Sequence, residues 1–120
     1  MKIAEYVGNN IVILEPTGRL TAETVHFFKQ AVAKRLCTGW HKLIVDLRHI
    51  DYIDSAGLGT LVHAYTSGRL RGARLVLVHV SGRNQELLRI TKLLTVFEVY
   101  ETTLEAERSL TRPSSESAVM

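Results

Sequence analysis

The sequence predicts a single α/β domain built on a mixed β-sheet. Two nearly continuous apolar runs, 43–47 (LIVDL) and 75–80 (LVLVHV), are typical of central strands that are covered on both faces. Segments with apolar residues at helical spacing alternate with these runs, which favours helices packed against a largely parallel sheet. Gly8-Asn9-Asn10 is a turn signal between two more apolar runs at the N-terminus, so a hairpin is expected to make the sheet mixed.

The first strands and the first helix follow from local signals. The hairpin strands are expected over 3–7 and 11–15, with Pro16-Thr17-Gly18 closing the second strand. Thr21 stands at an N-cap position, where its hydroxyl can accept from the first backbone N–H groups of a helix. An apolar stripe follows at helical spacing, and Gly39 ends the helix; the stripe consists of Val25, Phe28, Val32 and Leu36.

The central part of the chain is expected to form a strand, a polar turn and a helix. Residues 43–47 form the strand, and residues 48–54 form the turn, with Ile50 and Ile53 supplying apolar contacts. The helix is expected over 56–70, with one apolar face. That face consists of Leu58, Leu61, Val62 and Tyr65.

The last third of the chain is predicted to hold shorter elements. A strand over 75–80 is followed by a third helix near 87–94, a strand over 96–99 and a helix over 103–110. The domain is therefore expected to span 1–110, with about four helices flanking the sheet. Residues 111–120 are polar and contain a proline, so a disordered tail is expected there.

Composition excludes several classes of protein. A hydrophobic fraction of 46% and a charged fraction of 22% are ordinary for a globular domain. No apolar run approaches the roughly 18 residues of a spanning helix, and no signal-peptide core opens the chain, so a cytoplasmic location without membrane insertion is expected. The net charge of +3 has no dense basic stripe, so no nucleic-acid binding is predicted. The single Cys37 and five scattered histidines lack metal-ligand spacing, and no metal or other cofactor is expected.

Ser55 is the candidate residue for chemistry. It follows a strand and opens a helix, and α/β proteins usually build their sites in such loops. A phosphate there would meet free N–H groups at the helix start, and it would add roughly −1.5 to −2 charges beside Asp51 and Asp54. Serine is also among the best N-cap residues, so Ser55 has a purely structural alternative as the cap of the helix. The two roles are compatible.

Catalytic motifs fail at this position, so the sequence predicts a protein that is not an enzyme. A nucleophile elbow requires glycine two residues before the serine, where the chain has Ile53. His63 lies eight residues after Ser55 and has no orienting acid at a suitable spacing. Gly57-Leu58-Gly59 begins like a dinucleotide-binding fingerprint, but Val62 occupies the position of the third glycine.

The segment 50–59, IDYIDSAGLG, together with the preceding strand LIVDL, resembles the signature of the STAS domain family, which includes the bacterial anti-sigma factor antagonists. Upstream, residues 18–21 (GRLT) match the second recurrent turn of that family. Residues 89–102 (RITKLLTVFEVYET) are similar to the third helix and last strand of its single-domain members. The resemblance covers roughly residues 1 to 110 in order, without an insertion.

This resemblance implies a mixed sheet flanked by helices and a cycle of reversible phosphorylation. In the family, a serine kinase of the histidine-kinase-like ATPase type, which is also the anti-sigma factor, phosphorylates the serine that corresponds to Ser55. A serine phosphatase reverses the modification. The unmodified antagonist binds the anti-sigma factor and frees the sigma factor for transcription. Partner contacts are then expected from the residues of the two turns: Thr21, Asp51, Asp54, Ala56, Gly57, Leu58 and Gly59.

Two departures from the family pattern affect the expected site. Ala56 stands where the commoner turn has a second serine, which leaves Ser55 as the single acceptor. Thr21 replaces an aspartate that many antagonists carry, so it removes one acidic contact and offers a second hydroxyl as an alternative to its N-cap role. Two other functions within the family stay open: a cytoplasmic STAS subunit of a lipid-transporting ABC system, and a scaffold subunit of a stress-signalling assembly. The oligomeric state is also open.

Overall fold

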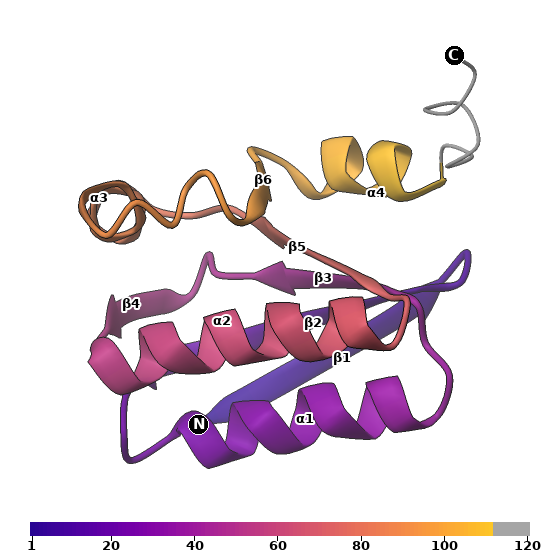
Figure 1. The fold of residues 1–120 in the computed structure, drawn as a ribbon, viewed down its shortest axis with the longest axis horizontal. Helices are drawn as coiled ribbons and strands as arrows, with labels where there is room; N and C mark the ends of the chain where they lie inside the picture. The colour runs from indigo at the N-terminus through magenta and orange to yellow at the C-terminus, as the bar shows by residue number, and fades with distance from the viewer. Residues whose placement is uncertain (112–120) are drawn as a thin grey trace.

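Six strands form one mixed β-sheet in the computed structural model, which describes residues 1–111. Across the sheet the order is β1 (Lys2–Gly8), β2 (Ile11–Leu20), β3 (Lys42–Asp46), β5 (Arg74–Val78) and β6 (Glu98–Tyr100). The short β4 (Ile50–Ile53) pairs with the last residues of β2. Only the β1–β2 hairpin is antiparallel, and the other pairs are parallel (Figure 1). The predicted mixed sheet with an N-terminal hairpin is therefore confirmed.

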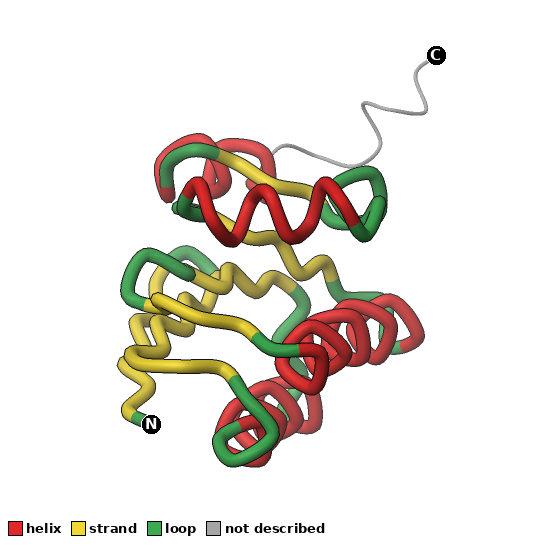
Figure 2. The backbone as a smooth tube through the Cα atoms, turned by 90° about the vertical axis from the view of Figure 1, so that its left-hand side faces the viewer, coloured by secondary structure: helices red, strands yellow, loops and turns green. Residues whose placement is uncertain are grey.

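Four helices cover the sheet within the described residues. Figure 2 shows two helices together on one side of the strands and two more on the opposite side. The first pair is α1 (Val25–Cys37) and α2 (Ser55–Leu70), which contact each other. On the other side, α4 (Thr103–Thr111) packs on β3, β5 and β6. Helix α3 (Gly82–Ile90) contacts β4, and its Leu88 joins the same hydrophobic cluster as α1 and α2. No helix among residues 1–111 has the length and apolar character needed to cross a bilayer.

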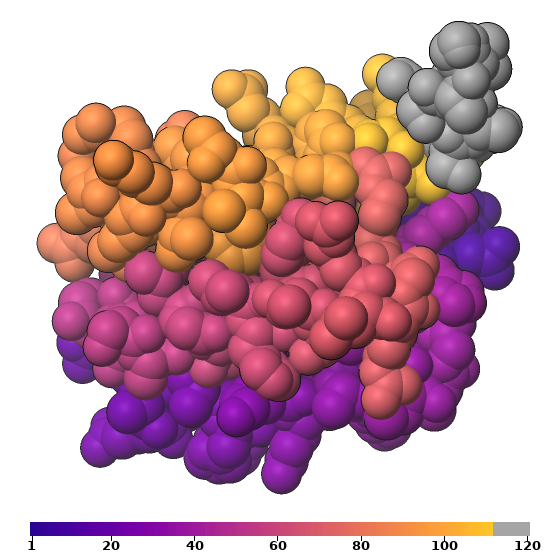
Figure 3. Space-filling view, in the orientation of Figure 1, coloured from indigo at the N-terminus to yellow at the C-terminus, as the bar shows by residue number. Residues whose placement is uncertain are grey.

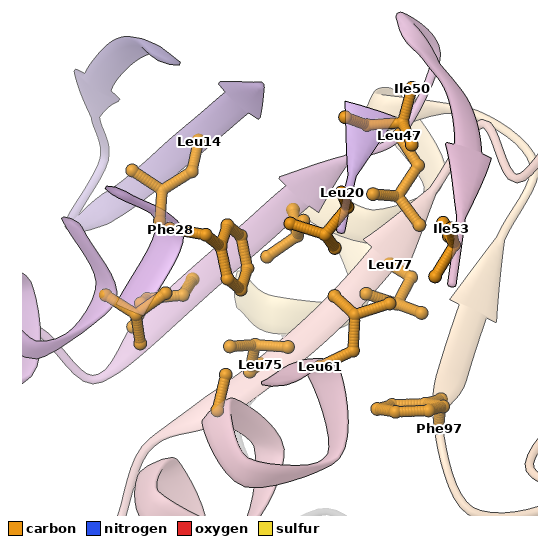
Figure 4. Close-up of a cluster of buried hydrophobic side chains, with 14 of the residues drawn as sticks. Leu14, Leu20, Phe28, Leu47, Ile50, Ile53, Leu61, Leu75, Leu77 and Phe97 are labelled. Atoms are coloured by element: carbon orange, nitrogen blue, oxygen red, sulfur yellow. The ribbon is translucent and has the colours of Figure 1, made fainter. Parts of the chain in front are cut away.

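The two sides of the sheet bury separate hydrophobic clusters. The larger cluster joins the sheet to α1 and α2, and Figure 4 shows Phe28, Leu61 and Leu77 meeting within it. The smaller cluster lies under α4 and consists of Ile11, Ile44, Val76, Val78, Ala106 and Leu110. Strands β3 and β5 contribute to both clusters, which explains why their sequences are almost continuously apolar.

Strand β2 is longer than the sequence predicts. It continues from Ile11 to Leu20 through Pro16-Thr17-Gly18, the predicted end of the strand. Proline and glycine weaken a strand in isolation. Here, however, the chain stays paired with β1 as far as Thr17 and with β4 from Gly18 onward. Tertiary pairing thus overrides the local signal.

Part of the predicted turn over 48–54 is also a strand. Residues Ile50–Ile53 form β4, which lies parallel to the end of β2. Ile50 and Ile53 are buried, whereas Asp51 and Tyr52 between them are exposed. The turn is confined to the residues before Ile50, whose amide donates to the carbonyl of Leu47 at 3.1 Å. Strand β4 was not predicted from the sequence, because a segment of four residues with only two apolar positions cannot be told from a turn that makes apolar contacts.

Helix α1 begins at Val25, so the predicted N-cap at Thr21 is wrong. Thr24 occupies the N-cap position, and residues 21–24 form a turn. The Thr24 hydroxyl donates to the carbonyl of Arg19 at 2.6 Å and accepts from the amide of Thr21 at 3.0 Å. The Thr21 carbonyl accepts from the amides of Thr24 and Val25, both at 2.9 Å. Its hydroxyl does accept from a backbone amide as predicted, that of Glu23 at 3.4 Å, but within this turn. Two threonines three residues apart offered alternative starts, and Thr24 is the one whose hydroxyl bonds to the Arg19 carbonyl.

Elements at the C-terminal end differ from their predicted bounds by a few residues. Strand β5 ends at Val78 instead of residue 80, because His79 adopts a positive φ of 55° that breaks the strand. Strand β6 is shifted to Glu98–Tyr100. The predicted tail over 111–120 lies outside the described residues except for Thr111, the last residue of α4.

Candidate docking and modification site at the start of α2

Asp54 connects the start of α2 to the turn that precedes α1. It is the N-cap of α2, and one carboxylate oxygen, Oδ1, accepts from the Gly57 amide at 2.8 Å. The other oxygen, Oδ2, accepts from the Ala22 amide at 3.1 Å. The Asp54 amide donates to the carbonyl of Leu20 at 3.2 Å. One side chain and its backbone therefore hold together two turns that lie more than 30 residues apart in the sequence.

These hydrogen bonds also fix the charge of Asp54. The bond from the Gly57 amide is the main cause that lowers the pKa of Asp54 below its ordinary value. Partial desolvation opposes this effect, and the Ala22 amide adds to the lowering. The carboxylate is therefore ionised at neutral pH, and a fixed negative charge lies next to Ser55.

Ser55 is the first residue of α2 and is exposed. The alternative that Ser55 caps the helix is wrong, because Asp54 performs that function. Within residues 1–111 the Ser55 hydroxyl makes no hydrogen bond, whereas the neighbouring Asp54 makes two with its side chain. The sequence placed the cap one residue too late, since aspartate and serine are almost equally good N-cap residues. The hydroxyl is left free on the surface.

Gly57 allows close packing inside the domain. It is buried, and a Cβ atom built on it would lie 2.0 Å from the carbonyl oxygen of Leu20. Such a contact is far inside van der Waals distance, so only glycine lets α2 approach the end of β2 this closely. The close approach at Gly57 is thus to the chain's own backbone. Gly59, two residues on, is exposed and has no heavy atom within 4 Å of its ideal Cβ position.

The other predicted contact residues surround Ser55 at different depths. Asp51 is exposed on β4, while Ala56, Leu58 and Thr21 are half-buried. Asp54 brings Thr21 into this region because it bonds to Ala22, the next residue. The two turns that carry the predicted contacts therefore form one continuous surface, whereas Gly57 lies beneath it.

Two further residues support this surface, and the sequence did not reveal them. Asn84 of α3 is buried, and its side-chain amide donates to the carbonyl of Ile50 at 3.0 Å, which fixes β4. Arg19 lies over the ring of Tyr52, with its guanidinium carbon 4.8 Å from the ring centroid. An asparagine in the first turn of a helix is an ordinary local feature, so nothing in the sequence indicated that Asn84 reaches across to β4.

A second polar cluster lies at the carboxyl ends of β3 and β5. The Asp46 carboxylate is almost fully buried and accepts from the backbone amide of Arg48 at 2.9 Å. His79 Nδ1 lies 3.1 Å from the same carboxylate oxygen. The Arg48 guanidinium contacts the imidazole, with Nη2 3.0 Å from Nε2. Asp46 and His79 were not singled out by the sequence because 33 residues separate them.

Nucleophilic catalysis by Ser55 has no geometric support. His63 lies eight residues further along α2, which is about 12 Å along the helix axis. No group of three metal-binding side chains occurs within residues 1–111. The arrangement instead presents a free hydroxyl beside two acidic side chains. Ser55, Asp51 and Asp54 together form an acidic rim at the start of α2.

The fold and the rim at Asp54-Ser55 define a STAS-type domain. The STAS domain model matches residues 2–106, and the chain belongs to this family. This result confirms the resemblance seen in residues 50–59.

Known relatives of the chain are anti-sigma factor antagonists by name. A Thermotoga neapolitana protein provisionally named an anti-sigma factor antagonist is 34% identical over 101 residues, which cover 83% of this chain and 89% of the relative. The anti-sigma-B factor antagonist of Listeria monocytogenes is 35% identical over 82 residues, which cover 68% of this chain and 72% of the relative. A crystal structure of a Thermotoga maritima protein with the same provisional name superposes with a TM-score of 0.87 at 29% identity, over 92% of this chain and 95% of that chain.

Proposed function

We propose that the chain is an anti-sigma factor antagonist that is switched by phosphorylation of Ser55. In its unmodified form it binds an anti-sigma factor that is also a serine kinase of the histidine-kinase-like ATPase type. Phosphorylation releases the antagonist, and a serine phosphatase restores it. The chain is then a substrate and a docking partner with no catalytic role of its own, and it acts in the cytoplasm, where ATP and the transcription machinery are present.

The free hydroxyl of Ser55 carries this proposal. Because Asp54 caps α2, the Ser55 side chain is exposed and engages no other group within residues 1–111. A kinase can therefore reach the hydroxyl without unfolding the helix. The backbone beneath it is rigid, since Asp54 and Gly57 bind the start of α2 to the Leu20–Ala22 segment. The named function of the relatives agrees with such a role.

Charge explains why phosphate at Ser55 would release a partner. The Gly57 amide, which would otherwise attract the phosphate, already donates to Asp54. A phosphate of roughly −1.5 to −2 charges would therefore sit beside an ionised carboxylate and remain a surface charge. Asp51, exposed on β4, adds a second acid to the same rim. At the centre of an interface an unpaired dianion of this kind costs several kcal/mol of affinity.

The site is tested by incubating the chain with its cognate kinase and ATP and locating phosphate by mass spectrometry. We expect one phosphate on the wild-type chain, none on Ser55→Ala, and one on Ser67→Ala, which removes another serine of α2. Thr21→Ala tests the second hydroxyl and is expected to accept phosphate as wild type does. Phosphate on Ser55→Ala at the wild-type level would show that the acceptor is elsewhere.

The release mechanism is tested by the affinity of the kinase for Ser55→Asp and Ser55→Ala, measured by isothermal titration calorimetry. Ser55→Asp adds a charge at the rim, and we expect it to weaken binding by at least about tenfold, or 1.4 kcal/mol. Ser55→Ala removes only the hydroxyl and is expected to bind within about threefold of wild type. If both variants bind equally well, charge at Ser55 is not what separates the partners.

A further inference from the structure

Helices α1 and α2 contain no acidic residue. The chain contains none between Glu23 and Asp46, and none between Asp54 and Glu86, and both helices lie within these intervals. Their charged residues are all basic: Lys29, Lys34, Arg35 and Arg69, with Arg71 directly after α2. In Figure 3 the two helices, purple and pink, lie side by side on the visible face. Arg35 is paired with Glu5 of β1 at 2.7 Å, so the other four basic residues give this face its positive charge, although the net charge of the chain is only +3.

A groove follows the line where the two helices meet. Its volume is about 190 Å³. Its floor is formed by Val32, Leu36 and Ala64, which are 3%, 6% and 4% exposed. Ala33 and Cys37 of α1 are exposed along it, and Lys29 and Arg71 add two cations. No acidic side chain lines the groove, and within residues 1–111 neither Lys29 nor Arg71 has an ion-pair partner. The two cations and the exposed side chains of Ala33 and Cys37 are therefore the groups that a ligand can reach.

The size and shape of the groove select the kind of ligand. Sites for drug-sized molecules are typically about 300–1,000 Å³, so this groove is too small to enclose one. It has room for one or two apolar side chains of a larger partner, and a furrow between two helices is the usual seat of an amphipathic helix. Acidic residues beside the apolar side chains of the partner would pair with the exposed cations Lys29 and Arg71. We infer that the α1–α2 groove docks an acidic amphipathic helix of a protein partner.

This docking site is distinct from the rim around Ser55. The groove includes Thr60, five residues after Ser55, and extends to Arg71 beyond the other end of α2. A phosphate at Ser55 adds charge at the start of α2, whereas the groove cations lie along α1 and after α2. The inference therefore stands independently of the phosphorylation proposal, and a variant at Ser55 serves as its control.

The inference is tested with a synthetic helical peptide of 15 residues. The peptide carries leucine at positions i, i+3, i+4 and i+7 and glutamate on its other face, and its binding to the full chain is followed by fluorescence anisotropy. We expect Lys29→Glu and Arg71→Glu to weaken binding by at least about tenfold each. Lys34→Glu makes the same charge change on α1 outside the groove, and we expect a change below about threefold. Ser55→Asp is also expected to leave peptide binding unchanged.

Cys37 offers a second readout because it lines the groove and is the only cysteine of the chain. A fluorine label on Cys37 should shift in the ¹⁹F spectrum when the leucine peptide binds, and it should not shift with a peptide whose leucines are alanines. Equal weakening by Lys34→Glu, or binding of the alanine peptide, would mean diffuse charge attraction and overturn the inference. Absence of peptide binding would also overturn it. The same variants are also tested with phosphatidylglycerol vesicles and with duplex DNA. If the chain binds vesicles or DNA through Lys29 and Arg71 but does not bind the peptide, the face belongs to a membrane or to a nucleic acid instead.

Discussion

Gly57→Ala is the sharpest test of how the site is built. The substitution adds one methyl group in the first turn of α2, where its carbon would lie 2.0 Å from the Leu20 carbonyl oxygen and 2.8 Å from the Leu20 carbonyl carbon. Both atoms belong to the backbone, so no rotamer change can remove the clash. The start of α2 must therefore move away from β2, against the hydrogen bond from the Asp54 amide to Leu20 and the bond from the Ala22 amide to Asp54.

Opposing effects set the size of the change. Alanine is better than glycine inside a helix by about 1 kcal/mol, which favours the variant. Overpacking costs about 1–3 kcal/mol, and each hydrogen bond that is broken costs about 0.5–1.5 kcal/mol more. We therefore expect Gly57→Ala to lower the free energy of unfolding by about 2–4 kcal/mol. For a domain of this size this corresponds to a fall in Tm of about 8–16 °C.

The matched control is Gly59→Ala, two residues further along the same helix. Its added methyl group meets no heavy atom within 4 Å, so only the helix preference remains. We expect Gly59→Ala to be more stable than wild type by about 0.4–1 kcal/mol. Urea unfolding followed by circular dichroism measures both variants. If Gly57→Ala is as stable as Gly59→Ala, the close packing of α2 on Leu20 does not exist in solution.

Three further predictions concern the supports of the site. Asp54 has a lowered pKa, so its stabilising effect is present above its unfolded-state pKa of about 3.9 and is lost as the pH falls through the lower folded-state pKa. In thermal unfolding, wild type should therefore be more stable than Asp54→Asn at neutral pH and lose that advantage below about pH 4; a constant difference at all pH values would contradict this. Asn84→Ala leaves the buried carbonyl of Ile50 without its donor, and urea unfolding should show a loss of about 1–3 kcal/mol, whereas the exposed neighbour Gln85→Ala should change stability by less than about 0.5 kcal/mol. At position 79, whose φ is 55°, glycine should be less destabilising than alanine by about 1 kcal/mol in the same assay, because alanine is strained in this conformation; equal stabilities would argue against the positive φ.

Apart from β4, the order of strands and helices was predictable because it depends on local patterns. The runs LIVDL and LVLVHV can hardly be anything but buried strands, and the stripe from Val25 to Leu36 has the period of a helix. The starts of two helices were wrongly predicted because neighbouring residues offered equivalent local choices. Thr21 or Thr24 could have preceded α1, and Asp54 or Ser55 could have capped α2. Backbone contacts outside each helix decided the outcome: the carbonyl of Arg19 for Thr24, and the amide of Ala22, 32 residues away, for Asp54.

The sequence by itself determined the family, the sheet and the position of Ser55, because these follow from the motif and from apolar periodicity within short windows. Only the tertiary structure decided that Asp54 caps α2 and leaves the Ser55 hydroxyl free, that Gly57 is required by the Leu20 backbone, and that α1 and α2 form a groove without acids. The physical reason is the separation in sequence between the residues that make these contacts. A cap, a close contact and a groove each depend on atoms that are far apart in the chain, and no local pattern records which of them meet.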